Sequence, residues 1–190
     1  KATADTVRDG WLYTGDMGYM DNDGYLYVVG RFKSLLISSD GEKYSPEGIE
    51  ESLADNSHFI DQVVLHNNQD PYTTALIVVN KEALKRYVHR KNPQMNWDSR
   101  EAKELALNKL QREIDAYRKD GKFEGMFPER WLPAAVAVIG EPFTEQNGLV
   151  NSTMKIVRGK VEEHYAGRIA SLYAAGAKEI INKENIDALS

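Results

Sequence analysis

The 190-residue sequence contains no cysteine, no long apolar stretch and no excess of positive charge. Without cysteine the chain forms no disulfide and offers no thiol nucleophile, which is compatible with a reducing compartment. The longest apolar run, 132–139, is far shorter than the roughly 20 residues that a membrane helix needs. The formal net charge of −5 argues against a nucleic-acid or membrane-surface protein, because both normally present a basic face.

Several catalytic patterns are also missing. The sequence has no GxxxxGK[ST] phosphate loop, no GxGxxG and no GxSxG elbow. Its four histidines lack metal-ligand spacing, so we expect no metal site. No signal peptide is recognisable, and the chain begins at Lys1 rather than Met. With 42% hydrophobic and 28% charged residues, the composition is that of a globular protein. The lack of cysteine is compatible with the cytoplasm, and the start at Lys1 leads us to expect a piece of a larger protein.

Turn residues and apolar periodicity predict short strands first, then a mixture of strands and helices. Ser45 and Pro46 have the types of an N-cap and a first helical residue, and Asp98 and Glu101 have capping-box spacing. The polar tail to Ser190 could fray. The expected strands are 17–20, 25–29, 35–37, 62–66, 74–79 and 134–139, and the expected helices are 46–55, 82–90, 98–117 and 156–173.

This order of elements predicts an α+β fold. N-terminal β hairpins precede a small, mostly antiparallel three-stranded sheet packed with helices. We place a domain boundary near Lys33. The compact domain then covers 33–175, with a helical insertion at about 98–130, and 176–190 form a C-terminal tail.

The segment 10–51 carries two groups suited to a nucleotide. Asp16 directly follows Gly15, and a carboxylate there can accept two hydrogen bonds from a vicinal diol such as that of ribose. Arg31 lies in a GRFK stretch and can hold a phosphate or a ribose with its planar donor fork. Each residue has an ordinary alternative, because Asp16 could cap a turn and Arg31 could be an exposed residue at a strand end.

A third candidate lies near the C-terminus. Lys155, in LVNSTMKIVR, stands where a loop passes into an expected helix, and a lysine there can present a point charge to an anion. The alternative is a solvated lysine at a helix start. Lys160 remains open as an alternative to Lys155.

The order and wording of these motifs resemble the C-terminal end of the acyl-adenylate-forming (AMP-binding) enzymes, which include the acyl-CoA synthetases. GWLYTGD is followed by DGYLYVVGRFKSLLISSDGEKYSPEGIE, a two-motif match in the expected order. NGLVNSTMKIVR looks like the last motif of the long-chain fatty acyl-CoA synthetases, with Asn-Ser-Thr where that branch usually has Thr-Pro-Thr. Without the proline the loop is less pre-set. The resemblance covers about 2–173.

The resemblance assigns a role to each candidate. Asp16 would bind the ribose hydroxyls of the adenylate, and Arg31 would contact the same ribose or a phosphate. Lys33 would be the hinge on which the small domain turns. Gly41 would approach the pantetheine thiol when the thioester forms. Lys155 would reach the substrate carboxylate and the α-phosphate during adenylation, as the catalytic residue.

The resemblance also implies the reaction and the partners. Residues 1–32 would be the end of a large N-terminal domain, and that domain would make most of the contacts with ATP, Mg²⁺ and CoA. The residues after Lys33 would form a rotating lid. A long-chain fatty acid would become acyl-AMP and then acyl-CoA, and the fragment alone would be inactive. We expect no nucleic-acid partner and leave peripheral membrane contact open. The alternatives are transfer to an acyl carrier protein and a non-catalytic interaction module.

Overall fold

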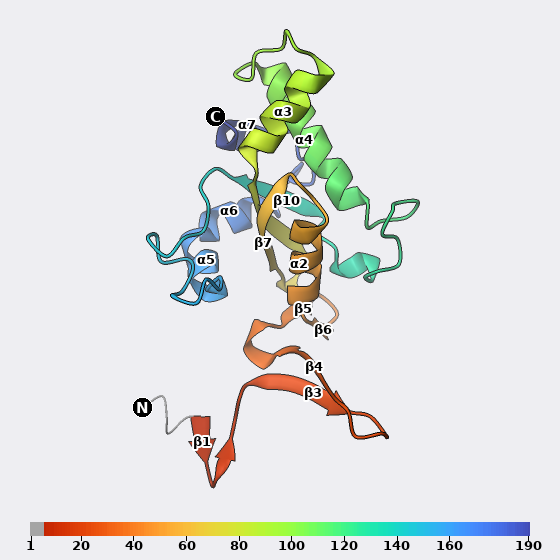
Figure 1. Ribbon diagram of the computed structural model, residues 1–190, viewed down its shortest axis with the longest axis vertical. Coiled ribbons are helices and arrows are strands. Elements are labelled where there is room, and N and C mark those ends of the chain that lie inside the picture. The colour runs from red at the N-terminus through yellow and green to blue at the C-terminus, as the bar shows by residue number, and fades with distance from the viewer. Residues whose placement is uncertain (1–5) are drawn as a thin grey trace.

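The structure is a computed structural model and describes residues 6–190. Figure 1 shows an elongated molecule, with small β hairpins at one end, a sheet with helices in the middle and a pair of helices at the other end. The strands are β1 (Val7–Arg8), β2 (Trp11–Leu12), β3 (Asp16–Met20), β4 (Leu26–Arg31), β5 (Leu36–Ser38), β6 (Lys43–Tyr44), β7 (Ile60–His66), β8 (Asn68–Asp70), β9 (Thr74–Val79) and β10 (Ala135–Ile139). The helices are η1 (Phe32–Ser34), α2 (Glu47–Asp55), α3 (Lys81–Lys91), α4 (Arg100–Asp115), η2 (Glu129–Trp131), α5 (Arg158–His164), α6 (Ala166–Ser171) and α7 (Lys183–Ala188).

The central sheet has the order β10-β9-β7, with β7 antiparallel and β10 parallel to β9. Every residue of β9 and β10 is buried, because helices cover both faces. Alternate residues of β9 enter two separate apolar clusters: Ala75 and Ile77 join the cluster that contains the buried residues of α2, α3 and α4. Leu76 and Val78 join the other, with residues of α5 and α6. The period of two along β9 therefore divides the core into two layers.

The edge strand β10 is closed by a side chain from the C-terminal segment. Asn185, in α7, is fully buried. Its Oδ1 accepts a hydrogen bond from the Val138 N–H at 2.8 Å, and its Nδ2 donates to the Val136 carbonyl at 3.0 Å. One amide thus replaces a strand partner for two backbone groups that would otherwise be buried without a partner.

A second three-stranded sheet, β6-β5-β8, joins the N-terminal hairpins to the central sheet. β5 pairs antiparallel with β6 and parallel with β8. The β3–β4 hairpin lies beyond it, away from the helices (Figure 1). Its register pairs Asp16 with Arg31 and Met20 with Leu26 across the predicted turn. The hairpin therefore stands apart from both core clusters.

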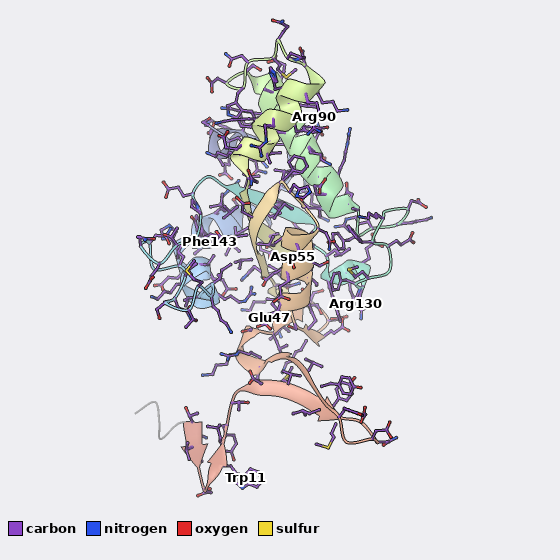
Figure 2. All side chains as sticks on the ribbon, viewed as in Figure 1. Trp11, Glu47, Asp55, Arg90, Arg130 and Phe143 are labelled. Carbon is purple, nitrogen blue, oxygen red and sulfur yellow. The ribbon has the colours of Figure 1, made fainter. Side chains whose placement is uncertain are left out.

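The hairpin region is unusually apolar on its surface. Among the described residues, the exposed large hydrophobic side chains lie between Val7 and Phe32 except for Met126 and Met154. Trp11 is 73% exposed and lies in the β1–β2 hairpin, at the end of the molecule far from the helices (Figure 2). So many exposed apolar side chains in one short segment are typical of a surface that contacts another protein.

The predicted α+β class is confirmed, and each predicted strand has a counterpart. The central sheet is mixed, because β10 runs parallel to β9, whereas the sequence suggested a mostly antiparallel sheet. The short strand β8 was not predicted, since Asn68–Asp70 lies inside a segment rich in turn residues. The domain boundaries at Lys33 and at 175 remain predictions.

Two predicted helix starts are wrong in detail. The N-cap of α4 is Ser99, whose hydroxyl accepts from the Ala102 N–H at 3.2 Å, and not Asp98. Ser99 takes this place because its extended backbone, with φ −69° and ψ 149°, aims the oxygen into the first turn. At α2 the N-cap position falls on Pro46 and carries no side-chain hydrogen bond, so Ser45 does not cap this helix.

Two expectations for the C-terminal part are also wrong. The single helix expected over 156–173 is divided into α5 and α6 at Tyr165, whose dihedrals leave the helical region where its ring packs against Phe143. The tail does not fray, because Ile180 and Leu189 enter the core and Asn185 closes the sheet edge. Polar groups of this segment also bond to the rest of the domain, since Lys103 donates to the Ser190 hydroxyl, so the polar composition of the tail did not indicate disorder.

We expect Asn185→Ala to lower the free energy of unfolding by roughly 3 kcal/mol, because several buried backbone groups lose their partner. Chemical denaturation of the purified chain measures this. Asn108→Ala, at an exposed position of α4, removes the same amide group and should change stability by less than about 0.5 kcal/mol. Equal effects of the two substitutions would contradict the role given to Asn185.

Candidate functional site

The structure brings Asp16 and Arg31 together at the base of the β3–β4 hairpin. They are directly paired residues of the two strands, and the Arg31 Nε lies 3.2 Å from the Asp16 Oδ1. Their side chains are 63% (Arg31) and 38% (Asp16) exposed. An exposed ion pair of this kind contributes little stability. Breaking the Asp16–Arg31 pair therefore costs little free energy, so both side chains are available to bind a ligand.

Lys33 lies in η1, the single turn between β4 and β5. Its side chain is exposed, and it follows the hairpin directly, where the chain enters the β6-β5-β8 sheet. Lys33 therefore lies at the junction between the β3–β4 hairpin and the rest of the described chain.

Gly41 lies in the turn between β5 and β6. Its N–H donates to the Ser38 carbonyl at 2.9 Å, and its φ is +85°. A Cβ on Gly41 would meet no atom within 4 Å, so the glycine is required by the backbone conformation and not by crowding. The open space beside Gly41 leaves its backbone accessible.

The neighbour of Gly41 is held by a clamp that the sequence did not reveal. Arg130 donates to both carboxylate oxygens of Glu42, at 2.6 and 2.7 Å, and the Trp131 indole N–H donates to Glu42 Oε2 at 3.0 Å. Trp131 in turn stacks on Tyr44, with ring centroids 5.0 Å apart. Figure 2 places Arg130 on η2, beside the sheet that contains β5 and β6. The clamp fixes the Gly41 turn from 88 residues away.

Lys155 lies on a closed loop between β10 and α5. A bridge between Val150 and Ile156 pairs the two sides of the loop. The Asn151 side chain accepts from the N–H groups of Thr153 and Lys155, at 3.0 and 2.9 Å. Asn151 N–H also donates to the Lys155 carbonyl at 2.9 Å. Asn151 therefore pre-sets the loop that lacks the proline.

The Lys155 side chain is exposed and makes no hydrogen bond or ion pair with another residue of the described chain. Lys160 is also exposed, one turn into α5. The structure does not join Lys155 to the Asp16–Arg31 pair, which belongs to the separate hairpin (Figure 1). The candidate residues thus lie at three separate exposed sites: the Asp16–Arg31 pair, the Gly41 turn and the Lys155 loop.

Within residues 6–190, no three His, Asp or Glu side chains gather in a way that could hold a metal ion. No helix in the same range has the length and apolar character needed to cross a membrane.

Comparison with known proteins gives a consistent relationship, although no family model matches the chain. The chain is 30% identical over 181 residues to long-chain-fatty-acid–CoA ligase FadD15 of Mycobacterium tuberculosis, covering 91% of this chain and 28% of that protein. It is 29% identical over 170 residues to long chain acyl-CoA synthetase 8 of Arabidopsis thaliana, covering 86% and 22%. The chain thus spans only about a quarter of the length of such relatives.

Solved structures show the same fold. The adenylation domain of a carboxylate reductase from Mycobacterium chelonae matches with a TM-score of 0.68 and 26% identity, over 90% of this chain and 24% of that one. The corresponding domain from Segniliparus rugosus, solved with AMP and a carboxylic acid, matches with a TM-score of 0.70 and 23% identity, over 91% and 25%.

The fold is that of the C-terminal domain of the adenylate-forming enzymes. Within that class, this chain is homologous over most of its length to the long-chain fatty acyl-CoA synthetases. The resemblance read from the motifs is therefore confirmed. The roles of Asp16, Arg31, Lys33, Gly41 and Lys155 remain predictions.

The clamp on Glu42 predicts a pH effect. Hydrogen bonds from Arg130 and Trp131 lower the pKa of the Glu42 carboxyl below its ordinary value of 4.5. The stability that the clamp contributes is thus present above pH 4.5 and is lost as pH falls through the lowered pKa. Carbon NMR of the Glu42 carboxyl should show a midpoint below 4.5 that rises in Arg130→Met. The Glu82 carboxyl, which Lys85 holds, is the internal control and should keep its midpoint.

Proposed function

We propose that this chain is the C-terminal part of a fatty acid–CoA ligase. The enzyme activates a long-chain fatty acid with ATP to acyl-AMP and then transfers the acyl group to CoA. Residues after Lys33 rotate between these two half-reactions. The observation that carries the proposal is that three exposed sites lie on the fold shared with adenylation domains. At one of them, the Lys155 ammonium has no hydrogen bond or ion pair with another described residue.

The hairpin surface supports the existence of a larger partner domain. The side chains between Val7 and Phe32 expose an apolar surface that an isolated domain would bury. The homologous ligases are also much longer, because this chain covers 28% of FadD15. We therefore assign the residues before Lys33 to the large adenylate-binding domain, with that domain covering the hairpin.

Lys155 fits the first half-reaction. Joining a carboxylate to the α-phosphate of ATP brings two anions together and expels pyrophosphate. A lysine ammonium between them offsets the repulsion and stabilises the charge that develops in the transition state. The closed Asn151 loop holds the backbone of Lys155, while its side chain stays free to reach the substrate. ATP brings its Mg²⁺ with it, and that ion neutralises the leaving pyrophosphate.

The second half-reaction needs space for a thiol and no lysine. Gly41 provides a turn without a side chain, with open space around it and a clamp at Glu42 that keeps it in place. Rotation about Lys33 would exchange the Lys155 loop for the Gly41 turn at one pocket. The Asp16–Arg31 pair stays with the large domain and holds the ribose of the adenylate in both steps.

The test is Lys155→Ala in the enzyme that carries both domains. Fatty-acid-dependent release of pyrophosphate should fall on the order of 100-fold or more, because the charge that stabilises the transition state is lost. Conversion of supplied acyl-adenylate and CoA to thioester should continue. Lys119→Ala, at an exposed turn, is the matched control and should leave both half-reactions unchanged.

Other outcomes separate the alternatives. Loss of adenylation in Lys160→Ala and not in Lys155→Ala would move the role to Lys160. Acyl transfer to a carrier protein in place of CoA would identify a different acceptor. Absence of pyrophosphate release with every fatty acid tested would favour a non-catalytic interaction module.

A further inference from the structure

A largely buried ion pair joins two helices that each follow one of the proposed functional loops. The Arg158 Nη2 donates to both carboxylate oxygens of Glu50 at 2.7 Å. The Arg158 Nη1 donates to the Leu65 carbonyl at 2.6 Å, and Glu50 Oε1 accepts from the Leu65 N–H at 2.6 Å. The Arg158 and Glu50 side chains are 18% and 13% exposed. Together they complete the hydrogen bonding of an edge residue of β7.

This network is rigid for physical reasons. An arginine fork on a carboxylate fixes both distance and orientation, and hydrogen bonds between charged groups are stronger than neutral ones. Burial raises the pKa of the Glu50 carboxyl, and the charge of Arg158 opposes that rise. Removal of either partner would leave the other charge buried and unpaired, which is costly. The network therefore tolerates little displacement.

The position of the pair in the chain gives it a consequence for Lys155. Arg158 is the first residue of α5 and lies three residues after Lys155. A second contact holds the next turn of α5, because His66 Nδ1 lies 2.9 Å from a carboxylate oxygen of Glu162. Both contacts fix α5 against β7.

The two sides of the Lys155 loop are also bonded to each other. The Val157 N–H donates to the Leu149 carbonyl at 2.8 Å, and the Asn151 side chain closes the loop inside this bond. The loop is thus closed on itself. On its C-terminal side Arg158, which is bound to Glu50 and Leu65, links it to β7, and the His66–Glu162 contact follows one turn later.

We propose that the Glu50–Arg158 pair positions the Lys155 loop for adenylation. This inference rests on the proposed function. The pair acts through the backbone of α5 and touches no substrate, so Glu50 and Arg158 are positioning residues. The Gly41 turn has its own clamp at Glu42, so loss of the Glu50–Arg158 pair should spare thioester formation.

The first test is Glu50→Gln in the 190-residue chain, because glutamine keeps the shape and can still accept from the Leu65 N–H. We expect the amides of Lys155 and Val157 to exchange hydrogen roughly tenfold faster, since a charged hydrogen bond that anchors the loop is lost. The amide of Ile77, in the middle of β9, should exchange as before. Glu104→Gln breaks the exposed pair with Arg100 and is the matched control.

The second test measures the half-reactions in the enzyme with both domains. In Glu50→Gln, kcat for fatty-acid-dependent pyrophosphate release should fall on the order of 10- to 100-fold, because a misplaced group loses effective molarity. The KM for ATP should stay within about twofold, since the nucleotide site lies elsewhere. Arg158→Lys keeps the charge but lacks the planar fork that spans Glu50 and Leu65, so its kcat should fall between those of the wild type and Glu50→Gln.

Three outcomes are distinguishable. Wild-type exchange at Lys155 and Val157 in the folded Glu50→Gln chain would overturn the inference, whatever the enzyme does. An equal loss of both half-reactions, together with a lower melting temperature, would also overturn it, because that pattern indicates general destabilisation. A wild-type enzyme that releases no pyrophosphate would refute the proposed function, while faster exchange would still show that the pair holds the loop.

Discussion

The structure depends on how a sheet of only three strands satisfies its two edges. A strand at an edge presents unpaired N–H and carbonyl groups, and here both faces of the sheet are covered by helices, so water cannot serve them all. At β10 the amide of Asn185 takes the place of a missing strand. At β7 the Glu50–Arg158 pair does the same for Leu65. Polar side chains from distant parts of the chain thus supply hydrogen-bond partners for backbone groups at both edges of the sheet.

The same bonds link the core to the candidate site. Arg158, the first residue of α5, bonds the Leu65 carbonyl at the edge of β7, and the Lys155 loop leads directly into α5. The Gly41 turn is attached separately, through Glu42 and Arg130, to the segment ahead of β10. Each loop is therefore held by its own arginine–carboxylate contact. The proposed rotation would therefore carry both loops with one body, while each loop keeps its own geometry.

Much of the fold followed from the sequence, because local signals determine it. The DNDG turn predicted the β3–β4 hairpin, and short apolar segments on either side of a turn-rich stretch predicted β7 and β9. The pairing of Asp16 with Arg31 was not predicted, because it depends on the register of the hairpin. The clamps could not be predicted in this way. Glu42 and Arg130 are 88 residues apart, and Glu50 and Arg158 are 108 apart, so no spacing rule connects them. Asn185 was missed for a related reason: a buried amide looks like any other polar residue until its partners are known.

The closure of β10 also has a consequence during synthesis. Val138 leaves the ribosome 47 residues before Asn185, which bonds to it in the folded chain. At ordinary translation rates that interval lasts roughly 2–10 seconds. Throughout it, an apolar strand with free backbone groups is present on a nascent chain, in the form that pairs most readily with other strands. The edge of β10 therefore lacks its side-chain partner until α7 has been synthesised.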